Sequence, residues 1–263
     1  MNKLRSKIWN EQRVNQWLYL RYFKRSYLGL LRGRLSTLLG RVVYQGTHRP
    51  LIMSAGIDYD MGTGSSIVMT DRSNHATPAD PANIFYPSAS SIGVLPHWNH
   101  MNPPMPHPTR LRIRNHAKLI LEPNTVILTG GYLAVWPGQE LWLGADTYLA
   151  HGVSINTRCS LRIGSNVMIG HETTIMDYDG HPVFSMMDEP ASNAGSYGGA
   201  AAPISIEDNV WIGFRTTVLK GVTIGSGSII GANSCVTSSI PTNCIAAGNP
   251  ARIIKENIVW RKY

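Results

Sequence analysis

Apolar residues recur at every sixth position in the last third of the chain. The series is Ile206, Ile212, Val218, Ile224, Ile230 and Val236. Small or β-branched residues come four positions after the first five of these, at Val210, Thr216, Val222, Ser228 and Ser234. A strand has a period of two and a helix a period of 3.6, so a period of six fits neither alone. The pattern predicts coils of three short flat faces, each with one inward apolar side chain and a turn at the corner.

The same spacing continues upstream with two-residue slips. Its members are Leu143, Leu149, Ile155 and Leu161, then Ile163, Ile169 and Ile175, with weaker members at Ile113, Leu119, Ile127, Leu133 and Leu141. Gly or Ala often follows the inward residue, as at Gly144 and Gly213, where a corner needs room. We therefore predict an all-β protein, a parallel β-helix of stacked hexapeptide coils over residues 111–250, followed by a tail at 251–263.

The first 47 residues differ from this repeat in both period and charge. Apolar residues fall in roughly helical steps without a proline, which predicts an amphipathic helical extension. Residues 1–50 contain eleven Lys and Arg against Glu11 alone, whereas the remaining chain has 13 basic and 15 acidic residues. Cations mixed with aromatics suit a helix on an anionic membrane surface; packing on the body or on a neighbouring subunit is the alternative. Nucleic-acid binding is the weaker interpretation.

Residues 48–110 predict a Pro/Gly/His-rich loop or arm. The stretch 95–108 alone has five prolines and three histidines, so neither a helix nor a central strand is expected there. His97 and His100 lack further ligands nearby, and no metal site is predicted. The three cysteines form no paired framework, which favours a reducing compartment. No apolar run reaches the ~20 residues of a membrane span, and no clean signal peptide opens the chain.

The repeat is interrupted once, between Asp177 and Ile204, by a polar segment rich in Gly and Ala. A long excursion from a rigid solenoid is a usual place for function, because the coils fix both of its ends. We predict a functional loop at about 178–203. Asp177 and Asp179 at its start are candidates for orienting a catalytic group or for binding acceptor hydroxyls, with solvated loop carboxylates as the alternative.

Three segments carry a resemblance to a known family: Asp208-Asn209-Val210-Trp211-Ile212-Gly213, Gly221-Val222-Thr223-Ile224-Gly225 and Ala247-Gly248-Asn249-Pro250-Ala251. They resemble the left-handed parallel β-helix acyltransferases with hexapeptide repeats. The combination looks like the branch of maltose and galactoside O-acetyltransferases and their relatives that modify bacterial polysaccharides. The resemblance implies a left-handed helix, a homotrimer, acetyl-CoA as acyl donor and no metal. The segment Gly180-His181-Pro182-Val183 resembles the catalytic-histidine segment of the family, which implies that His181 is the general base.

A sugar hydroxyl is a poor nucleophile at neutral pH, and a thioester is an activated donor, so one proton acceptor is the chemistry that is missing. The resemblance also implies acceptor contacts for Asn156 and Trp211, beside the candidates Asp177 and Asp179. For Trp211 a purely structural role is the alternative. Coenzyme A contacts are implied for the late coils, at Gly213, Ala232, Gly248, Asn249, Pro250 and Ala251, with Arg252 or Lys255 near the phosphates.

The sequence thus predicts an acetyl-CoA-dependent O-acetyltransferase for a sugar of a bacterial surface polysaccharide or its lipid-linked precursor. It is expected in the cytoplasm, peripherally on the inner face of the membrane. An antibiotic-modifying acetyltransferase and a non-catalytic trimeric scaffold at the membrane surface are the alternatives. A zinc enzyme of the γ-carbonic anhydrase type is a further one, because His151 and His171 are placed to stack on adjacent coils, but a third histidine is missing.

Overall fold

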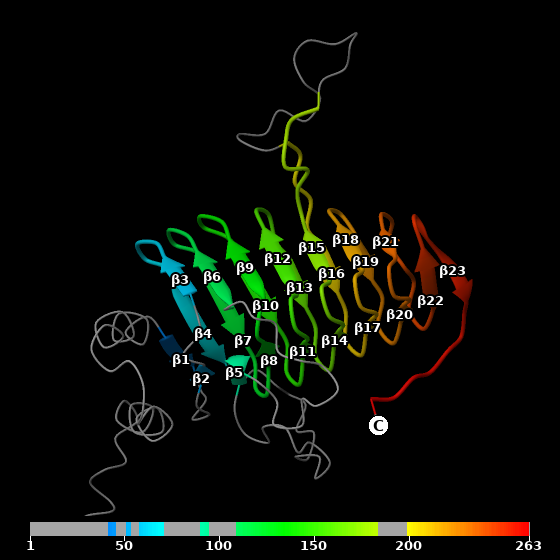
Figure 1. Cartoon of the computed structure of the whole chain (residues 1–263), viewed down its shortest axis with the longest axis horizontal. Coiled ribbons are helices and arrows are strands. Elements are labelled where there is room, and N and C mark those ends of the chain that lie inside the picture. Colours follow the sequence, from blue (N-terminus) through cyan, green and yellow to red (C-terminus); the bar gives the residue numbers. More distant parts are fainter. Residues whose placement is uncertain are drawn as a thin grey trace, which may run out of the picture.

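The computed structural model describes residues 42–45, 51–53, 58–70, 90–94, 109–183 and 199–262, and three sheets form the sides of a triangular prism (Figure 1). The first sheet contains β1 (Val42–Gln45), β4 (Ser66–Thr70), β7 (Lys118–Leu121), β10 (Glu140–Leu143), β13 (Leu161–Ile163), β16 (Ile204–Ile206) and β19 (Thr223–Ile224). The second contains β2 (Leu51–Met53), β5 (Ser90–Val94), β8 (Val126–Leu128), β11 (Tyr148–Leu149), β14 (Met168–Ile169), β17 (Trp211–Ile212), β20 (Ile229–Ile230), β22 (Ile245–Gly248) and β23 (Ala251–Lys255). The third contains β3 (Asp58–Met61), β6 (Arg110–Ile113), β9 (Tyr132–Val135), β12 (Ser154–Thr157), β15 (Thr174–Met176), β18 (Thr217–Leu219) and β21 (Cys235–Val236).

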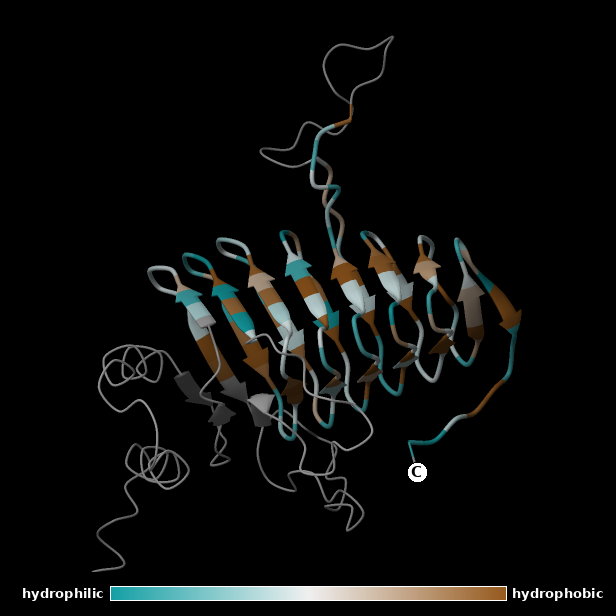
Figure 2. Cartoon of the chain, in the orientation of Figure 1, coloured by the Kyte–Doolittle hydropathy of each residue, from teal (hydrophilic) through white to brown (hydrophobic). Residues whose placement is uncertain are grey.

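The chain visits the three sheets in turn, so each strand pairs in parallel with the equivalent strand of the next coil. Leu141 lies opposite Leu161, and Ile163 lies opposite Ile206, across successive coils of the first sheet. The six residues of the last hexapeptide series are all at most 1% exposed and form one apolar column with the upstream series (Figure 2). The parallel β-helix predicted from the period of six is confirmed. Burying one apolar side chain per face explains why the spacing is so regular.

The corners explain the glycines and also a set of asparagines. A Cβ on Gly144 would lie 2.4 Å from the carbonyl carbon of Gly164 in the next coil, so the coils approach too closely there for a side chain. The same corner, between the first and second sheets, also has a left-handed residue in each coil, at Asn124, Asp146, Asn166, Asn209 and Asn243, with Gly227 in the coil between the last two. Asn and Asp tolerate this conformation better than other residues with side chains, which explains their recurrence.

The β-helix begins earlier than predicted. β1 lies in the segment predicted as helix, and β2 to β5 and the first residue of β6 lie in the segment predicted as loop or arm. These strands form because each pairs with a strand of the next coil; Ile67 in β4 lies opposite Leu119 in β7 and is fully buried. The boundary at residue 111 was therefore wrong, and the helix prediction was wrong for Val42–Gln45. The predictions for residues 1–41 and 95–108 fall outside the described residues.

The end of the chain runs back over the corner between the first and second sheets (Figure 1). β23 pairs antiparallel with β22, so the predicted tail begins as a strand. The Ile258 amide then donates to the Asn243 carbonyl at 2.9 Å, and Trp260 Nε1 donates to the Asn209 carbonyl at 2.8 Å. Lys262 Nζ reaches the Asp146 carbonyl at 3.3 Å. The tail therefore ties late coils to earlier ones. In the part of the chain described, no helix has the length and apolar character needed to cross a membrane.

Candidate active site

The predicted loop leaves the prism between β15 of the third sheet and β16 of the first as a two-stranded stalk (Figure 1). Its arms meet at an antiparallel bridge between Tyr178 and Ala201, and the Asp179 amide donates to the Ala200 carbonyl at 3.0 Å. Gly199 has a φ of +79°, and a Cβ there would lie 2.2 Å from the His181 carbonyl oxygen. Only glycine allows the arms to approach this closely, so the position of His181 depends on Gly199 in the opposite arm. Residues 184–198 lie outside the described residues.

His181 is exposed on this stalk. An exposed imidazole on a backbone that is fixed from both arms can approach a hydroxyl of a bound molecule and accept its proton. The structure therefore places the predicted general base at the one excursion from the coils that the described residues contain. No other His, Cys, Asp or Glu side chain in the described part of the stalk is both exposed and outside an ion pair.

Asp177 anchors the base of the stalk. Its carboxylate is fully buried and accepts hydrogen bonds from Thr157 Oγ1 at 2.6 Å and from the amides of Arg158, Cys159 and Ser160 at 2.7, 3.0 and 3.0 Å. Both oxygens are thus occupied by the preceding coil. The acceptor contact predicted for Asp177 does not fit this geometry, because a sugar hydroxyl has no access to a carboxylate that is enclosed in the body. Asp177 instead fixes where the stalk begins.

Asp179 is tied to the following coil. Its Oδ1 lies 2.6 Å from Nζ of Lys220, just after β18, and about a third or less of each side chain is exposed. The Gly221 amide also donates to the Ala202 carbonyl at 3.1 Å. Asp177 and Asp179 therefore hold the stalk between the coils before and after it. Asp179 still lies two residues from His181, within reach of a molecule bound there.

Asn156 lies on β12, opposite Met176 of β15 and next to the stalk. Its Nδ2 donates to the Tyr178 hydroxyl at 2.8 Å, and its Oδ1 accepts from Trp136 Nε1 at 3.2 Å. Both ends of the amide are engaged within this chain. The structure therefore brings Asn156, Asp179 and His181 to one corner of the prism, with Asn156 holding two aromatic rings.

The residues predicted to contact coenzyme A gather in the last coils. Gly213 and Ala232 occupy the same corner, between the second and third sheets, and a Cβ on Gly213 would lie 2.5 Å from the Ala232 amide nitrogen. The turn Gly248-Asn249-Pro250-Ala251 joins β22 to β23, and Gly248 donates its N–H to Ser234 Oγ at 3.1 Å. Arg252 and Lys255 are exposed on β23. The backbone groups and cations predicted from the sequence thus lie close together at one end of the prism.

Trp211 does not lie beside His181 within one chain. It is on β17 of the second sheet, 44% exposed, with its ring 6.0 Å from that of Trp260 in the tail. His181 is carried by the opposite corner, between the third and first sheets. A site that uses both residues therefore needs two copies of the chain.

The predicted stacking of His151 and His171 on adjacent coils is confirmed. Their ring centroids are 5.6 Å apart at an interplanar angle of 16°. Burial lowers the pKa of His151, and the neighbouring His171 lowers it further, while the backbone hydrogen bond to Thr129 opposes the shift. The described part of the chain contains no group of three or more His, Cys, Asp or Glu side chains that could hold a metal ion.

Sequence reasoning missed the aromatic and cationic residues beside the stalk. Trp136, Arg158 and Tyr178 lie in successive coils at the same corner, and Arg158 packs on both rings. Their spacing of 22 and then 20 residues is that of the coils themselves. The spacing of these three residues can be read from the sequence. That it places them side by side follows only from the lengths of the coils, which the structure supplies.

Comparisons with known proteins agree with this architecture. The bacterial transferase hexapeptide family, with six repeats, matches residues 203–238. The chain is a hexapeptide-repeat protein, similar to bacterial O-acetyltransferases. It is 40% identical over 119 residues to the galactoside O-acetyltransferase of Escherichia coli K12, which covers 45% of this chain and 55% of that protein. It is 34% identical over 133 residues to the polysialic acid O-acetyltransferase of Escherichia coli O1:K1, a match that covers 50% of this chain and 41% of that protein.

The chain thus spans about half the length of the curated relatives it matches. Among solved structures, the polySia-specific acetyltransferase NeuO has a TM-score of 0.59 and 22% identity, with 84% of this chain and 86% of that chain covered. This likeness establishes a shared fold, the left-handed parallel β-helix that the family resemblance implied. The resemblance stated from the sequence is confirmed at the level of repeat, fold and relatives.

Proposed function

We propose that this protein transfers the acetyl group of acetyl-CoA to a hydroxyl of a saccharide, with His181 as general base. The observation that carries the proposal is the exposed His181, held on a stalk that is anchored to the coils on both sides. The names of the relatives support it, because they acetylate hydroxyls of galactosides and of polysialic acid.

The reaction is a direct transfer in one site. A ring nitrogen of neutral His181 accepts the proton of the acceptor hydroxyl while the oxygen attacks the thioester carbonyl carbon. The tetrahedral intermediate collapses with cleavage of the carbon–sulfur bond, and the imidazolium returns the proton to the departing thiolate. The ester and free coenzyme A are the products. His181 then regains its neutral form, so the cycle needs no covalent acyl-enzyme.

The donor would lie along the late coils. The corner at Gly213 and Ala232 also carries the exposed ring of Phe214, an apolar surface suited to a pantetheine arm. Arg252 and Lys255 are exposed cations on the adjacent strand, suited to the phosphates of coenzyme A.

We propose a homotrimer whose active sites form between chains, since His181 and Trp211 lie on different sides of one prism. Closed cyclic assemblies repeat one heterologous contact around the ring, so each site would take His181 from one chain and Trp211 from its neighbour. Mixing inactive His181→Ala with inactive Trp211→Ala would then restore about one quarter of the sites in randomly mixed rings. No recovery on mixing, or full activity of Trp211→Ala alone, would contradict this arrangement.

The acceptor is proposed to be a bacterial surface polysaccharide or its lipid-linked precursor, modified at the inner face of the cytoplasmic membrane. The support is the excess of cations in residues 1–50. Sedimentation of the full chain with anionic vesicles, but not with neutral ones, is the expected result. Equal sedimentation of the protein with both kinds of vesicle would exclude the anchor. Unchanged sedimentation with anionic vesicles after deletion of residues 1–41 would exclude it as well.

The deciding experiment compares cells that carry the wild-type protein with cells that carry His181→Ala. We expect one O-acetyl proton signal of the purified surface polysaccharide to disappear in the variant. With a purified acceptor, acetyl-CoA consumption should fall roughly 10²–10⁴-fold. His116→Asn is the matched control, because His116 is also exposed and its left-handed φ of 58° suits asparagine. Full activity of His181→Ala would exclude this histidine as the base.

A further inference from the structure

Cationic and aromatic residues alternate along the corner that carries the stalk. The pairing of β6 with β9, β9 with β12, and β12 with β15 aligns Arg114, Trp136, Arg158 and Tyr178 at one position in four successive coils. Neighbouring strands lie roughly 4.8 Å apart, so this row extends about 14 Å along the prism. It ends at Tyr178, three residues before His181. We call these four residues the corner row.

The centre of the row is the Arg158 guanidinium, which packs against two rings that also contact each other. The Arg158 guanidinium carbon lies 3.8 Å from the Trp136 ring centroid and 4.8 Å from that of Tyr178. The Asn156 amide holds both rings through its hydrogen bonds to Trp136 Nε1 and the Tyr178 hydroxyl. The two rings meet edge to face at 6.3 Å. The positions of all three side chains are therefore fixed before any ligand binds, which lowers the entropy cost of binding.

Arg158 has unused binding capacity. Among the described residues no carboxylate forms an ion pair with its guanidinium, and the nearby Asp177 directs both oxygens to Thr157 and to backbone amides. A guanidinium has five N–H donors in a planar fork that matches a carboxylate. The side chain is only partly buried, so the N–H groups that do not face the rings remain for an anion. Trp136 is 36% exposed and offers an apolar surface beside it.

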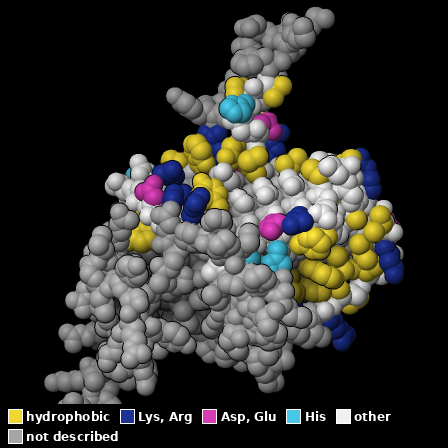
Figure 3. All heavy atoms as spheres, viewed as in Figure 1, with side chains coloured by type: hydrophobic (Ala, Val, Ile, Leu, Met, Phe, Trp, Pro, Cys, Tyr) yellow, Lys and Arg dark blue, Asp and Glu magenta, His cyan; other side chains and the backbone are white. Residues whose placement is uncertain are grey.

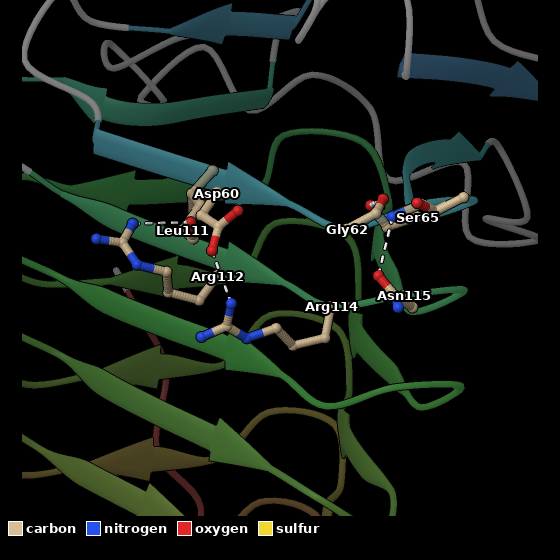
Figure 4. Close-up of polar contacts among 8 residues, drawn as sticks. Asp60, Gly62, Ser65, Leu111, Arg112, Arg114 and Asn115 are labelled. Atoms are coloured by element: carbon tan, nitrogen blue, oxygen red, sulfur yellow. Dashed lines mark hydrogen bonds and ion pairs between the residues drawn. The ribbon is translucent and has the colours of Figure 1, made fainter.

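The far end of the row has further cations (Figure 4). Arg114 pairs with Asp60 at 2.6 Å, but half or more of each side chain is exposed, and such a pair is weak enough for another anion to compete. Arg112 lies on β6, two residues before Arg114, and its guanidinium donates to the Leu111 carbonyl at 3.1 Å. Figure 3 shows Lys and Arg side chains together with hydrophobic ones on the surface next to the stalk. The positive charge thus continues over several coils.

We propose that the corner row binds an extended saccharide chain bearing carboxylates and leads it to His181. Carboxylates of the chain pair with Arg158 and Arg114, and sugar rings pack on Trp136. A row of four coils accommodates several linked sugars, so a polymer is favoured over a free monosaccharide. This inference rests on the proposed function for the role of His181, but binding along the row does not require turnover.

The test is binding of defined octamers to the purified full chain by calorimetry at low salt. The probes are an α2,8-linked sialic acid octamer, neutral maltooctaose and the oligonucleotide (dT)8. We expect the sialic acid octamer to bind most tightly and Arg158→Gln to weaken it about tenfold or more, because a charged hydrogen-bonding group is lost. Arg158→Lys keeps the charge without the planar fork, so its affinity should lie between the two.

Arg162→Gln is the matched control. Arg162 packs on Trp142 at 4.7 Å in the first sheet, a similar cation–aromatic pair outside the row, and its loss should leave binding unchanged. Thermal unfolding of each variant identifies any loss of fold. Equal binding of acidic and neutral octamers, tighter binding of (dT)8, or equal effects of Arg158→Gln and Arg162→Gln would overturn the inference. Acetyl transfer to acidic and neutral acceptors alike would overturn the inference about the corner row and leave the proposed function standing. Arg158-dependent binding without acetyl transfer to any acceptor would support the corner row and contradict the proposed function.

Discussion

Replacing Asp177 by asparagine tests whether the buried carboxylate sets the position of the stalk. The substitution preserves shape but turns one acceptor oxygen into an N–H₂ donor. In the better of the two amide orientations, the carbonyl oxygen keeps the three donors that Asp177 Oδ2 has from Thr157, Cys159 and Ser160. The N–H₂ group then faces the Arg158 amide, which now donates to Oδ1 at 2.7 Å.

Two buried donors are therefore left facing each other. An unsatisfied buried polar group costs about 1–3 kcal/mol, and the three remaining hydrogen bonds lose the assistance of a full charge. We expect a destabilisation of about 2–4 kcal/mol. At roughly 2–4 °C per kcal/mol for a domain of this size, the melting temperature should fall by about 5–15 °C. Because the stalk starts at this residue, kcat should fall as well.

Thermal unfolding gives the overall loss, and hydrogen exchange locates it. The amides of Arg158, Cys159 and Ser160 should exchange faster in Asp177→Asn, while the late coils stay protected. Asp208→Asn is the control, because Asp208 Oδ1 accepts one bond, from the Ser165 amide at 2.7 Å, that an asparagine carbonyl can keep. If both variants lost the same stability, or exchange rose equally in all coils, the anchoring role of Asp177 would be refuted.

Three further predictions follow from other parts of the prism. Trp260→Ala removes the bond to Asn209 and the contact with Trp211, so thermal unfolding should show a loss of about 2 kcal/mol. Gly164→Ala should cost about 1–3 kcal/mol, because its Cβ would lie 2.8 Å from the Asp208 backbone nitrogen; denaturant unfolding checks this. Burial lowers the pKa of His151 in the folded state, so the unfolded chain takes up its proton first and stability falls as pH drops below about 6.5. His151→Gln should flatten the melting temperature between pH 7.5 and 5.5; an unchanged slope would exclude this histidine as the cause.

The hexapeptide coils were predictable because every inward position must hold an apolar residue, whatever the other positions hold. A single apolar side chain must fill each face, and a polar residue there would be buried without a partner. Ile206, Ile212 and Val218 therefore reveal the fold without any structure. The early coils were missed because long segments, 71–89 and 95–109, separate β5 from the strands before and after it, so the six-residue period is broken there. Their pairing partners lie in later coils, as Ile67 does with Leu119.

Some features of the candidate site could likewise be predicted from the sequence, and others could not. The break in the repeat and the Gly180-His181-Pro182-Val183 segment locate the stalk and its histidine in the sequence alone. The burial of Asp177, the ion pair of Asp179 with Lys220, and the separation of His181 from Trp211 follow from how the coils stack.

The sequence by itself determined the all-β class, the repeat, the place of the loop and the resemblance to O-acetyltransferases. All of these are properties of residues close together in the chain. Only the tertiary structure decided which polar residues share a corner. Arg114, Trp136, Arg158 and Tyr178 are about one coil apart in sequence, yet parallel pairing aligns them in one row. Contacts between coils depend on the number of residues in each coil, and that number is fixed only when the strands have paired.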